Sequence, residues 1–139
     1  MAVRTAPPIR DLPIDLPAID LPESLSRYQP FAQIGRGGMA EVLLAEMRVG
    51  PGVSKLAVLK RVWPDLATDP EFLSLFLNEA RLGARMNHPN VVQTYELVED
   101  LERPLIALEY LDGQPLTRVL NRLVGSNTLA LTLRLRIIS

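Results

Sequence analysis

Apolar residues recur along the chain with two different spacings, which predict short strands and one long helix. From residue 31 to residue 62, short apolar runs alternate with glycine-containing turns, a pattern typical of antiparallel strands. From residue 70 to residue 86, apolar positions lie three and four residues apart, which predicts an amphipathic helix. Because strands dominate and a single long helix crosses them, the predicted fold class is α+β.

Five strands are expected, three before the helix and two after it. The first two flank a glycine cluster, and a Gly50-Pro51-Gly52 turn leads into the third. A further helical segment is expected to begin at Pro115 or Leu116, and another to occupy the last ten residues. The five strand ranges are 31–34, 41–47, 56–62, 91–97 and 104–108.

The long helix has signals at both ends. Thr68 and Glu71 have the spacing of a capping box, and Pro70 is tolerated in a first turn. The His88-Pro89 pair ends the helix. The helix is therefore expected to begin directly after Thr68.

One face of this helix is apolar except for a single carboxylate, Glu79. Burying a carboxylate unpaired is costly, so Glu79 needs a cation, a proton or a wet cleft, unless it lies at the edge of the face and stays solvated. Lys60 is the candidate cation, because it lies in the third strand, against which the helix is expected to pack. The alternative for Lys60 is an edge strand, from which its ammonium reaches solvent. The members of this face are Phe72, Leu75, Phe76, Glu79, Leu82, Gly83 and Met86.

Composition and charge narrow the classes of partner. The chain has 139 residues, which suits one domain, and its net charge of −1 leaves no basic excess for nucleic acid. With no cysteine and one histidine, disulfides are excluded and a zinc centre is not expected. No apolar run approaches the ~18 residues of a membrane span, and the first residues lack the apolar core of a signal peptide. A cytoplasmic protein without a membrane segment is therefore expected.

The beginning of the chain is rich in proline. Six of the twelve prolines fall within the first 30 residues, where Asp-Leu-Pro occurs three times. Proline removes backbone donors and favours extended conformations in the preceding residue. Residues 1–26 are therefore predicted to form a flexible leader, which serves either as a linker or as a docking motif for a partner.

The glycine cluster between the first two predicted strands reads Gly35-Arg36-Gly37-Gly38-Met39-Ala40-Glu41-Val42. Glycine allows backbone N–H groups to approach phosphate oxygens closely, although a glycine-rich hairpin without any ligand is the alternative. A dinucleotide-binding loop would open a helix, and a Walker loop needs Gly-Lys-Ser/Thr; neither pattern is present. A glycine loop that joins two antiparallel strands is the arrangement of protein kinases.

Five motifs in order resemble the N-terminal lobe of a protein kinase, of the bacterial eukaryotic-like serine/threonine type. They are the glycine cluster, the strand Ala57-Val58-Leu59-Lys60, the helical Asn78-Glu79-Ala80, the link His88-Pro89-Asn90-Val91-Val92, and the gatekeeper and hinge Leu108-Glu109-Tyr110-Leu111-Asp112-Gly113. The likeness runs from about Tyr28 to the end of the chain. It implies a kinase lobe with a five-stranded antiparallel sheet and hinge over residues 27–111, followed by the truncated beginning of a helical C-lobe over 112–139.

The resemblance also implies an ATP site. Backbone amides of the glycine loop would cover the phosphates, and Lys60, paired with Glu79, would contact the α- and β-phosphates. Val42 and Val58 would enclose adenine, whose edge would bind the Glu109 carbonyl and the Leu111 amide, with Leu108 as gatekeeper. The implied cofactor-binding residues are Ile34, Gly35, Arg36, Gly37, Gly38, Met39, Ala40, Val42, Val58, Lys60, Glu79, Leu108, Glu109 and Leu111.

Three residues depart from the family pattern. Ala40 replaces the third glycine of the loop, and Val58 replaces the usual alanine above adenine, which implies a tighter pocket roof. Gly83 stands where the family often has a larger residue. Glycine inside a helix costs about 1 kcal/mol relative to alanine, and it is expected to leave a packing gap. We therefore expect a mobile helix and a Lys60–Glu79 pair that is only partly formed without ligand.

The sequence lacks the two aspartate motifs of a kinase. Its last aspartate is Asp112 and its only histidine is His88, so neither His-Arg-Asp nor Asp-Phe-Gly is present. No catalytic residue is therefore assigned, and the protein ligands for the Mg²⁺ of a complete kinase are missing. The apolar face of the last helical segment, residues 129–138, is expected to promote self-association.

The sequence is interpreted as the ATP-binding portion of a serine/threonine kinase, which transfers the γ-phosphate of ATP to protein hydroxyls. The isolated chain is expected to be inactive, as a fragment or as a free-standing lobe. The alternative is a non-catalytic, pseudokinase-like module that binds nucleotide or a partner.

Overall fold

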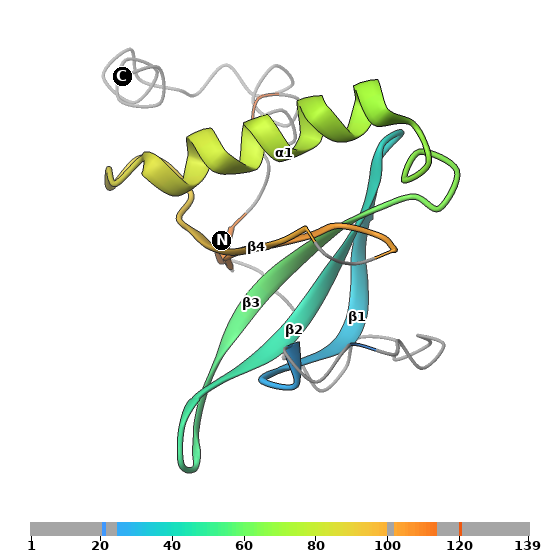
Figure 1. Cartoon of the computed structure of the whole chain (residues 1–139). Helices are drawn as coiled ribbons and strands as arrows, with labels where there is room; N and C mark the ends of the chain where they lie inside the picture. Colours follow the sequence, from blue (N-terminus) through green and yellow to red (C-terminus); the bar gives the residue numbers. More distant parts are fainter. Residues whose placement is uncertain (1–20, 22–24, 100–101, 114–119, 121–139) are drawn as a thin grey trace.

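Five antiparallel strands form one sheet, and one helix lies across a face of it (Figure 1). The structure is a computed structural model and describes residues 21, 25–99, 102–113 and 120. The strand order across the sheet is β1-β2-β3-β5-β4. The elements are β1 (Tyr28–Arg36), β2 (Ala40–Gly50), β3 (Val53–Val62), α1 (Pro70–Arg85), β4 (Thr94–Val98) and β5 (Leu105–Glu109). The predicted α+β class, with three strands, a helix and two strands, is confirmed.

The strand ends differ from the predicted ranges where turns decide them. The β2–β3 ladder continues to the pair Gly50–Val53, beyond the expected ends of both strands. Gly52 closes that hairpin with φ +67°, a conformation that glycine adopts without steric cost. β4 begins three residues later than expected, because the Val91 N–H donates to the His88 carbonyl at 3.0 Å in a turn. The helical segments expected from residue 115 onward lie outside the described residues, apart from Leu120.

The N-terminus of α1 is capped by Asp69, so the predicted capping box at Thr68 is wrong. The Asp69 carboxylate accepts from the backbone N–H groups of Glu71, at 3.0 Å, and Phe72, at 3.2 Å. Thr68 instead donates its hydroxyl to the Asp65 carbonyl at 3.0 Å. The cap therefore lies one residue later than expected, directly before Pro70 at the first helical position. None of the helices that the structure describes is long and apolar enough to span a membrane.

The face of α1 that packs on the sheet is rotated relative to the predicted apolar face. Phe76 and Ala80 are its buried residues, and Phe72, Leu73 and Leu77 are partly buried around them. Leu75 and Leu82 are 67% and 63% exposed, and Met86 is exposed as well. Apolar residues cover more than half of the helix circumference, so the helix could pack on the sheet through either of two neighbouring apolar rows. The sheet contacts the row formed by Phe72, Phe76 and Ala80, whose members are spaced by four.

A second core lies on the face of the sheet opposite α1. It is formed by alternate residues of four strands, together with Leu25 from the segment before β1. Leu25 has no exposed surface, although it belongs to the predicted leader. The rest of the predicted leader, apart from Leu21, lies outside the described residues. The buried members of this core are Leu25, Tyr28, Leu43, Ala45, Met47, Ala57, Leu59, Leu105 and Ala107.

The sheet curls around this second core until its two edge strands meet at one end. β1 and β4 are the outermost strands in the order, yet the Tyr28 hydroxyl of β1 donates to the Glu96 carboxylate of β4 at 3.0 Å. Arg27 forms an ion pair with the same carboxylate. These contacts place the start of β1 beside β4 and enclose the second core. Burial and the Glu96 carboxylate raise the pKa of Tyr28 to about 12.

Tyr28→Phe tests this closure through the pH dependence of stability. The pKa of Tyr28 is higher in the folded state than the ordinary value of about 10 in an unfolded chain, so the stabilisation is complete below pH 10 and falls as the pH rises toward 12. Loss of the hydroxyl is expected to lower the free energy of unfolding by about 1–2 kcal/mol at pH 8. Denaturant unfolding of both proteins between pH 8 and pH 11.5 measures this, and the difference between them should shrink above pH 10. Parallel pH profiles would contradict the assignment.

Candidate functional site

Four residues singled out in the sequence lie on the face of the sheet that carries α1. In the ladders, Val42 is paired with Lys60 across β2 and β3, and Val58 is paired with Leu108 across β3 and β5. Directly paired residues of antiparallel strands project to the same face. Lys60 and Val58 lie two residues apart in β3 and therefore also share a face. The structure thus brings together Val42, Val58, Lys60 and Leu108.

Lys60 lies in the centre of the sheet. β3 has β2 on one side and β5 on the other, so the edge-strand alternative for this lysine is wrong. Its ammonium nitrogen lies 3.5 Å from a carboxylate oxygen of Glu79 and 5.5 Å from the centre of the Phe76 ring. The Lys60 side chain is 24% exposed. An ammonium in this position is directed by α1 but still reaches solvent.

Glu79 is both solvated and paired. Its side chain is 66% exposed, so it lies at the edge of the packed helical face rather than within it. The 3.5 Å separation from Lys60 exceeds the roughly 2.7–2.9 Å of a charge-assisted hydrogen bond. An ion pair this exposed contributes about 0–1 kcal/mol to stability. The ion pair therefore acts mainly on the position of the Lys60 ammonium. The expected mobility of α1 stays a prediction.

A mostly apolar cavity of about 400 Å³ lies beside this ion pair, between α1 and the sheet. Lys60 and Glu79 are its charged lining residues, and Leu108 and Ile106 form part of its wall from β5. Leu82 of α1 and Met86, the residue directly after α1, also line the cavity, and both of these apolar side chains are exposed.

Gly83 brings α1 close to β4, contrary to the expected packing gap. A Cβ atom at this position would lie 2.9 Å from the Thr94 hydroxyl oxygen, closer than such atoms approach in practice. The absence of a side chain therefore permits a tight contact between helix and sheet.

The glycine loop joins β1 to β2, and one hydrogen bond closes it. The Gly37 N–H donates to the Ala40 carbonyl at 2.9 Å and closes the loop. Among the described residues, the backbone N–H groups of Gly38 and Met39 have no hydrogen-bond acceptor. A Cβ atom at Gly35 would lie 3.3 Å from Val42 across the ladder, which explains a glycine there. Ile34, Arg36 and Met39 are exposed around the loop.

The hinge segment begins at the end of β5, whose last residue is Glu109. The Glu109 N–H donates to the Gln93 carbonyl at 2.9 Å, so this amide is used within the sheet. Leu111 lies two residues beyond and is exposed, and its N–H has no acceptor among the described residues. The same part of the chain contains no group of three or more His, Cys, Asp or Glu side chains that could hold a metal ion.

Comparison with known proteins identifies this arrangement. The profile of the family described as protein tyrosine and serine/threonine kinase matches residues 29–138. The chain belongs to the protein kinase family. The five-stranded sheet with one helix is the N-terminal lobe of that fold, as the resemblance implied.

The related kinases are bacterial and longer than this chain. The tyrosine-protein kinase MasK of Myxococcus xanthus is 36% identical over 121 residues, which cover 86% of this chain and 19% of MasK. The probable serine/threonine-protein kinase PknB of Bifidobacterium longum is 42% identical over 104 residues, which cover 68% of this chain and 14% of PknB. A crystal structure of the Mycobacterium tuberculosis PknI kinase domain matches with a TM-score of 0.61 and 27% identity, over 77% of this chain and 41% of that domain. The chain thus spans a fifth or less of these curated relatives.

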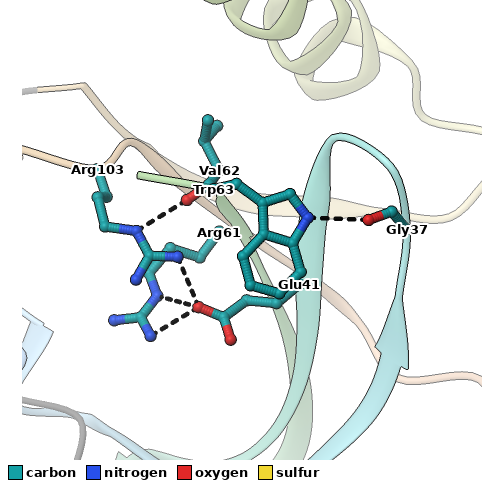
Figure 2. Close-up of polar contacts among 6 residues, drawn as sticks. All are labelled: Gly37, Glu41, Arg61, Val62, Trp63 and Arg103. Atoms are coloured by element: carbon teal, nitrogen blue, oxygen red, sulfur yellow. Dashed lines mark hydrogen bonds and ion pairs between the residues drawn. The ribbon is translucent and has the colours of Figure 1, made fainter. Parts of the chain in front are cut away.

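Sequence reasoning missed a charged cluster behind the glycine loop of this kinase lobe (Figure 2). One carboxylate oxygen of Glu41 accepts from Arg61 at 2.8 Å and from Arg103 at 2.7 Å. Arg103 also donates to the Val62 carbonyl at 2.8 Å, which ties the β4–β5 connection to the end of β3. Glu41 is 8% exposed and is the buried charged residue of the described core. Glu41 and Arg61 stand opposite each other in the ladder, a relation that requires the strand register.

Glu41→Ala should destabilise the lobe more than breaking an exposed pair of the same type. It leaves two largely buried guanidinium groups without their carboxylate, for an expected loss of about 2–3 kcal/mol. Glu99→Ala is the matched control, because Glu99 binds Arg81 through three contacts of 2.8–3.2 Å at the surface. The control should cost less than about 1 kcal/mol. Urea unfolding of the three proteins measures both values, and equal losses would show that burial of the Glu41 cluster has no energetic weight.

Proposed function

We propose that this chain binds ATP on the α1 face of its sheet, as the nucleotide-binding part of a protein kinase that transfers the γ-phosphate to protein hydroxyls. The observation that carries the proposal is the position of Lys60, which lies in the central strand between an apolar surface and the Glu79 carboxylate. The apolar surface suits a base and the ammonium suits phosphate. An apolar surface for the base and a cation for the phosphates thus lie next to each other.

The residues that would hold the adenine ring fit a flat apolar group. Val42 and Val58 are both partly exposed on the face where Lys60 lies, and they are diagonal neighbours, because Val42 is paired with Lys60 and Val58 lies two residues before Lys60 in β3. Leu108 is paired with Val58 and limits the depth of the pocket. Beyond it, the unpaired Leu111 N–H and the Glu109 carbonyl are proposed to bind the polar edge of adenine.

The residues that would hold the phosphates are Lys60 and the amides of the glycine loop. Glu79 keeps the ammonium on the cleft side of the sheet, and because the pair is loose, Lys60 can turn toward a phosphate at little cost. The Gly38 and Met39 amides supply two further donors. ATP brings the transferable phosphoryl group itself. The described residues do not fit a magnesium ion, since they contain no acidic cluster, so the metal enters the proposal only through the nucleotide.

Serine and threonine are the proposed acceptors. This choice is supported by relatives such as PknB of Bifidobacterium longum and PrkC of Bacillus subtilis, which are described as serine/threonine-protein kinases, whereas MasK is described as a tyrosine-protein kinase. The protein is proposed to be cytoplasmic. The relatives are described as kinases and give no specific support to the pseudokinase-like alternative. A kinase is therefore proposed.

Nucleotide titration of Lys60→Met tests the proposed site. The unmodified chain is expected to bind ATP with a Kd of roughly 100 µM or weaker, about −5.5 kcal/mol. Lys60→Met should weaken ATP binding about tenfold, the effect of losing one charged contact, while adenosine binding stays within twofold. The unfolding midpoint should hardly change, because the Lys60–Glu79 pair is exposed. Isothermal titration calorimetry measures the affinities.

Lys55→Met is the control for this titration. Lys55 lies in the same strand, but its ammonium lies 4.0 Å from the centre of the Tyr95 ring, away from the proposed site. The control should bind ATP like the unmodified chain. If the two methionine variants weaken ATP binding equally, or if the unmodified chain binds no ATP at millimolar concentration, the proposed function is wrong.

A further inference from the structure

Trp63, the residue directly after β3, binds the glycine loop through two hydrogen bonds. Its indole N–H donates to the Gly37 carbonyl at 2.8 Å (Figure 2), and its backbone N–H donates to the Met39 carbonyl at 3.3 Å. The Arg36 guanidinium also lies over the indole ring, 4.8 Å from its centre. Trp63 therefore contacts residues on both sides of Gly38, at the tip of the loop.

Holding the Gly37 carbonyl also sets the direction of the next amide. A trans peptide unit is planar, and its C=O and N–H groups point in opposite directions. Because the Gly37 carbonyl points at the indole, the Gly38 N–H of the same peptide unit points away from it. This N–H is one of the two loop amides without an acceptor among the described residues. The indole thus fixes the direction of a free donor that it does not touch.

Trp63 is itself held in place. It follows Val62, which is fully buried at the end of β3. The Val62 carbonyl accepts from Arg103, and Arg103 also binds the Glu41 carboxylate of β2. Glu41, at the base of the loop, is therefore connected through Arg103 to the backbone next to Trp63, which binds the tip of the loop. Glycine-rich loops are otherwise flexible, because glycine restricts the backbone least.

We propose that Trp63 is a positioning residue that presets the Gly38 amide for the phosphate groups of a nucleotide. This inference rests on the proposed function, since it concerns the same site. A loop that is already ordered loses less conformational entropy when it binds, and the gain falls only on ligands that reach the loop. Trp63 therefore favours nucleoside polyphosphates over the unphosphorylated nucleoside. An aromatic side chain that merely covers the surface would not distinguish these ligands.

The first test follows loop mobility without any nucleotide, in the full 139-residue chain. Trp63→Phe keeps an aromatic ring and removes the indole donor. Backbone ¹⁵N relaxation should show an order parameter of about 0.8 for the Gly38 amide in the unmodified chain and below about 0.6 in the variant. Trp63 is the only tryptophan, so the single indole N–H signal of the unmodified chain should also exchange slowly with solvent. Tyr95→Phe is the control, with a similar aromatic change in β4, and its loop order parameters should not change.

The second test compares ATP and adenosine by calorimetry in the same three proteins. Trp63→Phe should weaken ATP binding about fivefold to tenfold, as expected for the loss of one hydrogen bond, and should change adenosine binding less than twofold. Equal weakening of both ligands, or unchanged ATP binding, would overturn the positioning role. If the unmodified chain prefers ATP over adenosine by less than twofold, the proposed phosphate site is wrong. The relaxation measurement then still decides whether Trp63 orders the loop, because unchanged order parameters in the variant overturn the inference on their own.

Discussion

The register of β3 between β2 and β5 is the constraint on which the site depends. It places Lys60 opposite Val42 on one side and opposite Ile106 on the other. A shift by one residue would move the lysine to the opposite face, because side chains alternate along a strand. The register is enforced by Ala57 and Leu59, which are fully buried in the second core and would be exchanged with Val58 and Lys60 by such a shift. The second core, on one face of the sheet, thus keeps Lys60 on the opposite face, beside α1.

The two faces of the sheet use charge in different ways. On the face away from α1, Glu41 is saturated by two arginines and largely removed from water, so this cluster joins three segments of the backbone. On the α1 face, Lys60 has one exposed and rather distant partner. Solvent screens the second pair far more than the first. The buried cluster therefore supports the fold, whereas the loosely paired lysine, which still reaches solvent, stays available to a ligand.

Local patterns in the sequence were sufficient to predict the elements and the central ion pair. The five strands, the helix and the approach of Lys60 to Glu79 all depend on periodicity and on which strand a helix packs against. The helical orientation was not predictable in this way. Leu75 and Leu82 are as apolar as Leu73 and Leu77, and only the shape of the sheet decides which pair is packed. The helix cap had a similar ambiguity, because Thr68 and Asp69 are both good capping residues. The contacts of Glu41 with Arg103 and of Trp63 with Gly37 join residues 62 and 26 positions apart, and no local signal indicates them.

The close approach of Gly83 to Thr94 couples two positions that belong to different elements. A methyl group at residue 83 would enter the space of the Thr94 hydroxyl, so a side chain at the helix position requires the Thr94 side chain to turn away or to be smaller. During divergence, the two positions are thus expected to change together, with alanine in the helix accompanied by alanine rather than threonine in β4. Alanine at residue 83 without a change at Thr94 would press against the Thr94 hydroxyl in the last turn of α1, near the cavity that this turn helps to line. The choice of side chains at these two positions is in this way linked by a contact that involves neither the lysine nor the glycine loop.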